Sequence, residues 1–301
     1  MFLFSEMGKK KDFKAEYRII RESPFEVLAL CDMAIPKKTC TFLEDEKYIP
    51  FLKDNISMVI TTGQIAAKLE LKQEGIIVTE HPRILFFQIH NFLADDEKYK
   101  RKENKNFISN KANISEMAWI AGHDVRIEEN VLIEPFVTIY PHVHIGKNTV
   151  IRSGARIGGE GFEFKRFAEK IIPVKHLGGV EIGSDVEIQN NSCIDKAVYP
   201  WDNTVIGDDT KVDNLVYIAH GVKVEPNVLI AGSSGIGGRT VIGRDTWIGL
   251  GSEVRNGLNI GKSARINMGA VVTKPVMDGQ SVSGNFAVEH HEFLKFMKIQ
   301  R

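Results

Sequence analysis

Aliphatic side chains recur at every sixth position through most of the C-terminal two thirds of the chain. The hexad positions are 127, 133, 139, 145, 151 and 157, then 182, 188 and 194, then every sixth residue from 206 to 272; six, three and twelve make 21 hexads. A period of six fits neither an α-helix nor an ordinary strand pair, and it is typical of a parallel β-helix. Three hexads form one triangular coil with the aliphatic side chains inside. The pattern therefore predicts seven coils.

The N-terminal third follows a different pattern of short apolar runs and helical spacing. Segments 57–62 and 75–80 are typical of buried strands, and the segment between them has helical spacing. A helix is predicted over 82–93, where Pro82 suits the first helical turn. We therefore expect a mainly β chain with a small N-terminal α/β domain and a short C-terminal helix. The expected boundaries are 1–95 for the α/β nucleotide-binding domain, 96–107 for a charged linker, 108–284 for the β-helix and 285–301 for the helix.

The hexad pattern is interrupted twice. Between 157 and 182 the phase slips by one, and positions 163, 169 and 175 all carry charged side chains, so this segment is expected to leave the coil as a loop. The loop carries Phe162, Phe164 and Phe167, which either pack on the β-helix or reach a neighbouring chain. The second interruption, around Pro200, is shorter. Long irregular segments in compact folds are often functional.

The second interruption determines which residues lie next to one another on adjacent coils. When it is skipped, His220 lies beside Lys196 and Asp195 and over Gly238 in the next coil. A lone histidine at a corner is often only a solvated surface residue. Here, however, a base above a bare backbone N–H is the arrangement that acyl transfer requires, since one group takes a proton and the other holds the oxyanion. His220 and Gly238 are therefore the catalytic candidates.

Composition narrows the classes of partner. Lys plus Arg and Asp plus Glu are equal at 39 each, which argues against nucleic acid or an anionic membrane as the main partner. Three scattered cysteines fit a reducing compartment, and no apolar run approaches the ~20 residues of a membrane span. We expect a cytoplasmic protein.

The remaining histidines give little support for a metal. His142 and His144 flank the inward Val143 and point outward, and no histidine set repeats at coil spacing. We find no glycine-rich phosphate loop, nucleophile elbow or Cys–His pair. The sequence therefore predicts no metal site and no permanently bound cofactor.

Four segments carry a resemblance to a known family. "TFLEDEKYIPFL", "GGEGFEF", "CIDKAV" and "DNLVYIAHG" are similar to motifs of the bacterial hexapeptide acyltransferases, and among them of UDP-3-O-acylglucosamine N-acyltransferase of lipid A synthesis and its relatives that acylate nucleotide-linked amino sugars. The resemblance covers nearly the whole chain from about Cys40. It implies a left-handed β-helix, His220 as general base, the N–H of Gly238 as oxyanion donor, and a base held between Phe42 and Tyr48.

The resemblance also implies partners and further substrate contacts. The family forms trimers with the active site between adjacent prisms, so a homotrimer is expected, with acyl-CoA or acyl carrier protein as co-substrate. An aromatic pair in a small α/β domain is alternatively part of its core. The residues expected to contact substrate are Phe42, Asp45, Tyr48, Phe162, Phe164, Asp195, Lys196 and Asn214.

The sequence departs from the family pattern at several positions. Asp45 stands where the family has Asn, Lys196 where it has Arg, and Leu258 where lipid A enzymes have a second histidine. The amphipathic tail after 285 is short, and it either caps the last coil or docks an acidic carrier protein. These departures favour an acyl-CoA donor and a surface-glycan amino sugar over the lipid A reaction with 3-hydroxyacyl carrier protein. A non-catalytic nucleotide-binding scaffold is the third hypothesis.

Overall fold

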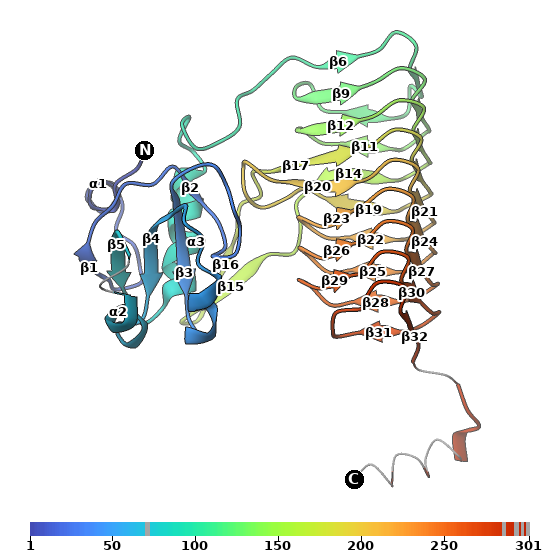
Figure 1. Cartoon of the computed structure of the whole chain (residues 1–301). Coiled ribbons are helices and arrows are strands. Elements are labelled where there is room, and N and C mark those ends of the chain that lie inside the picture. Colours follow the sequence, from blue (N-terminus) through green and yellow to red (C-terminus); the bar gives the residue numbers. More distant parts are fainter. Residues whose placement is uncertain (70–72, 285–286, 292–294, 296–297, 299–301) are drawn as a thin grey trace. The chain divides into compact units, whose positions relative to one another are not determined.

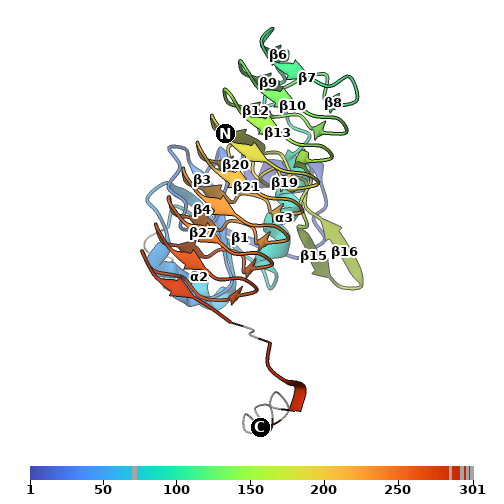
Figure 2. The same cartoon turned by 90° about the vertical axis from the view of Figure 1, so that its right-hand side faces the viewer.

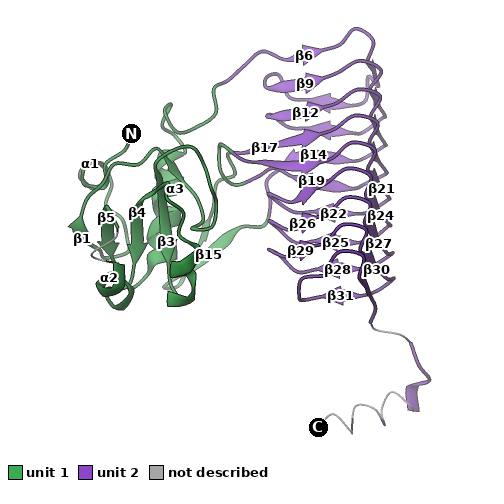
Figure 3. Ribbon diagram, in the orientation of Figure 1, with its two compact units in different colours: residues 1–102, 162–177, 198–201 green, residues 103–161, 178–197, 202–301 purple. Residues whose placement is uncertain are grey.

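The chain divides into two compact units. The computed structural model describes residues 1–301 except 70–72, 285–286, 292–294, 296–297 and 299–301. Unit 1 comprises residues 1–102, 162–177 and 198–201, and unit 2 comprises residues 103–161, 178–197 and 202–301 (Figure 3). The predicted C-terminal helix lies largely outside the described residues. Residues 96–107, predicted as a linker, divide between the two units.

Unit 1 is built on a five-stranded sheet with the order β1-β5-β4-β3-β2. Strands β2 to β5 run parallel, and β1 is antiparallel to β5. The strands predicted at 57–62 and 75–80 and the helix predicted at 82–93 are confirmed as β4, β5 and α3. The elements are α1 (Phe4–Lys10), β1 (Arg18–Arg21), β2 (Val27–Leu28), β3 (Thr39–Leu43), the 3-10 helix η1 (Glu46–Phe51), β4 (Ile56–Thr61), α2 (Gly63–Leu69), β5 (Gly75–Val78) and α3 (Pro82–Leu93).

Both interruptions of the hexad pattern belong to unit 1. The segment expected to be a loop instead contains an antiparallel hairpin of β15 (Phe164–Phe167) and β16 (Lys170–Pro173). From the second interruption, Tyr199 is buried in the aromatic core of unit 1 and stacks on Trp201 at 5.4 Å. The Trp201 indole N–H donates to the carbonyl of Leu28 at 3.0 Å. Both inserted segments therefore help to complete the hydrophobic core of unit 1, although in the sequence they lie within the β-helix part of the chain.

A buried histidine links α3 to the same inserted segment. The ring nitrogens of His90 contact the Tyr99 hydroxyl at 2.9 Å and the Lys175 carbonyl at 2.8 Å. Burial lowers the pKa of His90 to about 4, so the imidazole is neutral near pH 7. Its role is to satisfy buried polar groups within unit 1.

Unit 2 is a left-handed parallel β-helix of three sheets, and the predicted fold class is confirmed (Figures 1 and 2). The first sheet contains β6 (Phe107–Ile108), β9 (Val125–Ile127), β12 (Val143–Ile145), β17 (Gly179–Ile182), β20 (Asn203–Ile206), β23 (Lys223–Val224), β26 (Val241–Ile242) and β29 (Asn259–Ile260). The second contains β7 (Asn113–Ile114), β10 (Leu132–Ile133), β13 (Val150–Ile151), β18 (Glu187–Ile188), β21 (Lys211–Val212), β24 (Leu229–Ile230), β27 (Trp247–Ile248), β30 (Arg265–Ile266) and β32 (Ser281–Val282). The third contains β8 (Trp119–Ile120), β11 (Thr138–Ile139), β14 (Arg156–Gly159), β19 (Cys193–Asp195), β22 (Tyr217–Ile218), β25 (Gly235–Ile236), β28 (Glu253–Val254) and β31 (Val271–Val272).

The predicted stacking across the second interruption is confirmed, and the coils also stack across the first. Ile194 pairs with Ile157 before it and with Ile218 after it, although the sequence separations are 37 and 24 residues. Ile218 in turn pairs with Ile236. The aliphatic column that these residues form is almost completely buried. The register brings the turn after β22 between the turns after β19 and β25, which is the corner that holds the candidate site.

Candidate active site

His220 lies in the turn between β22 and β23 and is only 7% exposed. Gly221 follows it at a φ of +70°, a conformation that glycine adopts without strain. The Gly221 N–H donates to the Thr204 hydroxyl oxygen at 2.8 Å, and that hydroxyl donates to the carbonyl of Asp195 at 2.6 Å. Thr204 therefore ties the His220 turn to the preceding coil.

Gly238 lies directly against the His220 ring. A Cβ atom built at Gly238 would stand 2.8 Å from both Cε1 and Nε2 of the imidazole. Any other residue would therefore displace the ring. The Arg239 N–H donates to the His220 carbonyl at 3.0 Å, so the two turns are also joined through the backbone. This places the Nε2 edge of the imidazole over the backbone of the next coil.

Asp195 occupies the coil before His220. It is 8% exposed, and the Tyr217 hydroxyl donates to its Oδ2 at 2.8 Å. Burial raises the pKa of the Asp195 carboxyl, while the hydrogen bond from Tyr217 and the attraction of the His220 imidazole act in the opposite direction. Asp195 therefore lies on the coil next to the one that carries His220, because β19 pairs with β22.

Lys196 adds a cation to the same corner. Its side chain is 16% exposed, and Nζ lies 3.8 Å from Oε1 of Glu160. Burial lowers the pKa of Lys196, and Glu160 opposes that shift. The Lys196 N–H donates to the Gly159 carbonyl at 2.9 Å. A partly buried ammonium at this position suits an anionic ligand group.

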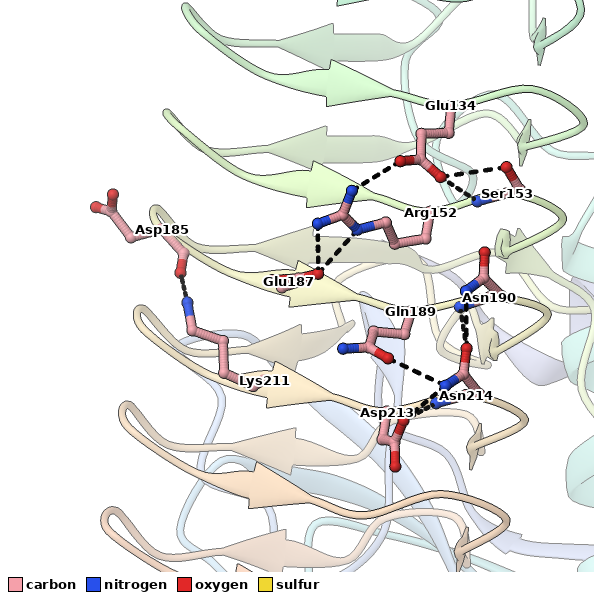
Figure 4. Close-up of polar contacts among 10 residues, drawn as sticks. All are labelled: Glu134, Arg152, Ser153, Asp185, Glu187, Gln189, Asn190, Lys211, Asp213 and Asn214. Atoms are coloured by element: carbon pink, nitrogen blue, oxygen red, sulfur yellow. Dashed lines mark hydrogen bonds and ion pairs between the residues drawn. The ribbon is translucent and has the colours of Figure 1, made fainter.

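Among the predicted substrate contacts in unit 2, Asn214 is the one that does not lie at the His220 corner. It lies in the turn before β22, one corner away from the His220 turn. Its Nδ2 donates to Oε1 of Gln189 at 3.1 Å, and its Oδ1 accepts from Nδ2 of Asn190 at 2.8 Å (Figure 4). A similar ladder joins Arg152 to Glu134 and Glu187 on neighbouring coils. The contacts of Asn214 therefore hold successive coils together.

The predicted base-binding residues lie in unit 1. Phe42, in β3, packs against Phe86 with ring centroids 4.9 Å apart, and the Arg83 guanidinium lies 5.6 Å from its ring. Tyr48, in η1, is 44% exposed. Asp45 caps η1, because its Oδ1 accepts from the N–H of Lys47 at 3.0 Å. Phe42 thus shares in the core, whereas Tyr48 presents its ring to solvent.

A cavity of about 580 Å³ lies at the carboxyl ends of β3 and β4. Ligands of open α/β sheets bind at this edge. Three of its carboxylates are paired, Glu44 with Arg83 at 2.8 Å, Asp45 with Lys47 at 2.8 Å, and Glu46 with Lys68. The lining residues are Glu44, Asp45, Glu46, Thr62, Gly63, Gln64, Ile65 and Glu80.

Phe162 and Phe164 form an exposed aromatic pair at the start of the hairpin. Their ring centroids lie 4.9 Å apart, and the side chains are 83% and 46% exposed. Phe167, the third aromatic of this segment, instead packs against the core of unit 1. The structure therefore separates one core aromatic from two that present their rings to solvent.

Two residues at the His220 corner were missed in the sequence. Tyr217 holds the Asp195 carboxyl, and Thr204 ties the turn. Tyr217 occupies an outward hexad position three residues before His220, and a polar aromatic at that position was the available signal. No signal in the sequence pointed to Thr204, because its contacts depend on how the chain returns to the β-helix after the second interruption.

The chain matches a known family model in two segments. Residues 124–159 and 203–238 match the model described as "Bacterial transferase hexapeptide (six repeats)". These two segments therefore resemble bacterial transferase hexapeptide repeats. The second segment ends at Gly238 and includes His220, so both catalytic candidates lie within it.

The curated relatives that this chain matches carry the name of the family whose motifs its sequence resembles. UDP-3-O-acylglucosamine N-acyltransferase of Bordetella pertussis is 36% identical over 166 residues, which cover 53% of this chain and 45% of the relative. UDP-3-O-acylglucosamine N-acyltransferase 2 of Legionella pneumophila is 41% identical over 158 residues, 52% and 46% of the two chains. The predicted resemblance is thereby confirmed, although the chain spans about half the length of these relatives.

Solved structures give a weaker match. A crystal structure of UDP-N-acetylglucosamine acyltransferase is 22% identical with a TM-score of 0.48, covering 65% of this chain and 80% of that one.

Within the described part of the chain, no helix combines the length and apolar character that a membrane span requires. Among the same residues, no group of three or more histidine, cysteine or acidic side chains is arranged to hold a metal ion.

Proposed function

We propose that the protein is an N-acyltransferase that moves an acyl group from a pantetheine thioester to the amine of a nucleotide-linked amino sugar. The observation that carries the proposal is the His220 imidazole lying with its Nε2 edge 2.8 Å from the Cβ position of Gly238. His220 is only 7% exposed. The names of the relatives support the same reaction.

The chemistry follows from this pair. The sugar amine attacks the thioester carbonyl while His220 takes its proton, and the N–H of Gly238 donates to the oxyanion that forms. Collapse of this intermediate breaks the C–S bond, and the thiolate leaves and takes up a proton to give free thiol and an amide. General base catalysis contributes about 10²–10⁴-fold, and one oxyanion donor about 3 kcal/mol.

The nucleotide is assigned to unit 1. Phe42 and Tyr48 are the proposed stacking partners of the base, and neither of them lines the cavity beside Asp45. Tyr48 is exposed, so its ring is available to a ligand. The exposed Phe162–Phe164 pair is a further proposed contact, and Lys196 is the proposed partner of an anionic group of either substrate.

The acceptor and donor are the finer points of the proposal. The departures from the family pattern favoured a short acyl-CoA and a surface-glycan sugar. The relatives' names instead support UDP-3-O-acylglucosamine as the acceptor, and we place it first. Its donor would be a 3-hydroxyacyl carrier protein, and acyl-CoA is the alternative.

We also propose an oligomeric state and a cellular compartment for the protein. We expect a C3 homotrimer, since the flat face of a second prism could pack beside the His220 corner and supply a further wall of the site. The three cysteines are free, which supports a reducing compartment such as the cytoplasm.

A donor-by-acceptor assay tests the proposal. Free thiol is measured with 3-hydroxyacyl carrier protein or acetyl-CoA, each with UDP-3-O-acylglucosamine or another UDP-linked amino sugar. We expect thiol release to require both substrates. Ligand-induced thermal stabilisation without thiol release for any pair would support the nucleotide-binding scaffold instead.

A further inference from the structure

Arg83 lies over the ring that is proposed to stack on the base. Its guanidinium carbon is 5.6 Å from the centre of the Phe42 ring, and the same ring packs against Phe86 and Phe87 in the core of unit 1. Phe42 is only partly buried. An arginine guanidinium is planar and stacks on aromatic faces. A cation therefore stands at the ring where the nucleotide is proposed to bind.

Glu44 holds Arg83 at two points. Its Oε2 lies 2.8 Å from Nη2 of the guanidinium, and its Oε1 accepts the backbone N–H of Arg83 at 3.3 Å. Arg83 is the second residue of α3, so the backbone contact satisfies one of the N–H groups that a helix leaves free at its start. The two side chains are 49% and 35% exposed. An ion pair with this exposure contributes little, so a competing anion can replace the carboxylate at the guanidinium.

The cavity at the carboxyl ends of β3 and β4 does not suit phosphate groups. Its lining includes four carboxylates and neither lysine nor arginine: Glu44, Asp45, Glu46 and Glu80. Like charges repel, so the phosphates of a nucleotide held at Phe42 are directed away from this cavity. The guanidinium over the ring offers them a cation instead. Arginine suits phosphate because its five N–H donors form a rigid fork.

We propose that Arg83 is a nucleotide-binding residue, whose guanidinium exchanges Glu44 for the diphosphate of a nucleoside diphosphate sugar when the base reaches Phe42. This inference rests on the proposed function, which assigns the nucleotide to unit 1. Movement of the guanidinium leaves the backbone N–H of Arg83 bonded to Glu44, so the start of α3 stays satisfied. The exchange therefore requires a change in one side chain only.

Binding of UDP and of uridine to the full chain tests the proposal without turnover. Dissociation constants are measured by ligand-observed nuclear magnetic resonance, and we expect the wild-type chain to bind UDP more tightly than uridine. Arg83→Gln should weaken UDP binding about 10- to 100-fold, because hydrogen bonds to a charged group are lost. It should not weaken uridine binding by more than about two-fold, since uridine carries no phosphate. Unchanged UDP binding, or equal losses for the two ligands, would overturn the proposal.

Glu44→Gln should have the opposite effect. The glutamine keeps an acceptor for the Arg83 N–H but removes the charge that competes with phosphate, so UDP should bind about two- to five-fold more tightly. Unchanged or weaker UDP binding would contradict the exchange. Lys68→Gln is the matched control, because Lys68 pairs with Glu46 in the same unit, and it should bind UDP as the wild-type chain does. Equal losses in Lys68→Gln and Arg83→Gln would reduce the effect to general charge and overturn the assignment.

The outcomes also separate this assignment from the proposed function. Melting temperature checks that each variant is folded. If Arg83→Gln shows the selective loss of UDP binding but the wild-type chain releases no thiol with any substrate pair, the proposed function fails and the assignment stands. If the wild-type chain releases thiol and Arg83→Gln binds UDP normally, the assignment fails and the function stands. A wild-type chain that binds neither UDP nor uridine would overturn the assignment.

Discussion

Gly238→Ala is the substitution whose effect follows most directly from the structure. The new Cβ would stand 2.8 Å from Cε1 and Nε2 of His220, and 3.2 Å from the His220 carbonyl oxygen. Ordinary van der Waals contact begins at 3.4 Å, so the ring must move by at least 0.6 Å, the difference between the two distances. The φ of Gly238 is not in the left-handed region, so the substitution acts through these contacts with His220 and not through backbone strain.

Displacement of the ring should cost activity more than stability. Misplacement of a catalytic group by about 1 Å costs on the order of 10²-fold in rate, whereas overpacking at a buried site costs about 1–3 kcal/mol of unfolding free energy. We therefore expect kcat for thiol release to fall by one to two orders of magnitude, to about 1–10% of the wild-type value, while the chain stays folded. Both quantities are measured on the same preparation, by thiol release and by urea denaturation.

Gly122→Ala is the matched control. Gly122 lies in the turn after β8, at the corner equivalent to that of His220, and a Cβ there meets no atom within 4 Å. Its kcat and stability should match those of the wild-type chain. Wild-type kcat in Gly238→Ala would refute the reasoning, because it would mean that the ring position does not matter. Equal losses in both variants would point to a general effect on the coils.

Two further predictions concern other parts of the chain. Phe42→Ala should raise the KM for the sugar nucleotide at least several-fold with little change in the donor's KM, because stacking on a base contributes about 1–3 kcal/mol; a variant that unfolds would support the core hypothesis for Phe42. The hydrogen bond to Glu181 is the main cause that raises the pKa of His144. Its stabilising effect is present below the unfolded-state pKa and is lost as pH rises through the folded-state value, so His144→Gln should destabilise the chain more at pH 5.5 than at pH 8.5, measured by urea denaturation. Equal destabilisation at both pH values would contradict the role of that contact.

The sequence predicted the β-helix because its signal is local and periodic. Each inward aliphatic residue reports its own position in the coil, and Ile218 could be aligned with Ile194 without knowledge of the fold. This alignment is why the proximity of His220 to Asp195 and Lys196 could be predicted, whereas Gly238 follows His220 by one uninterrupted coil. The first coil, from β6 to β8, was not counted among the hexads, because an extra residue between Ile120 and Ile127 breaks the period.

What depends on long-range packing was not predictable in the same way. Tyr199 and Trp201 are read locally as part of a break in the repeat, and only the fold shows that they complete the core of unit 1. The same limit applies to Asp195, whose partner Tyr217 is 22 residues away in sequence and on the next coil. Nothing in the spacing of these two residues indicates that the Tyr217 hydroxyl donates to the Asp195 carboxylate.

Thiol release by His220→Ala, compared with the wild-type chain, tests the central claim most directly. Both proteins are assayed with each donor and UDP-3-O-acylglucosamine, and melting temperature and sedimentation confirm that fold and assembly are unchanged. We predict that the wild-type chain releases thiol only when both substrates are present, and that His220→Ala is slower by two or more orders of magnitude. Near-normal turnover in the folded variant would contradict the account, because it would remove His220 from the reaction.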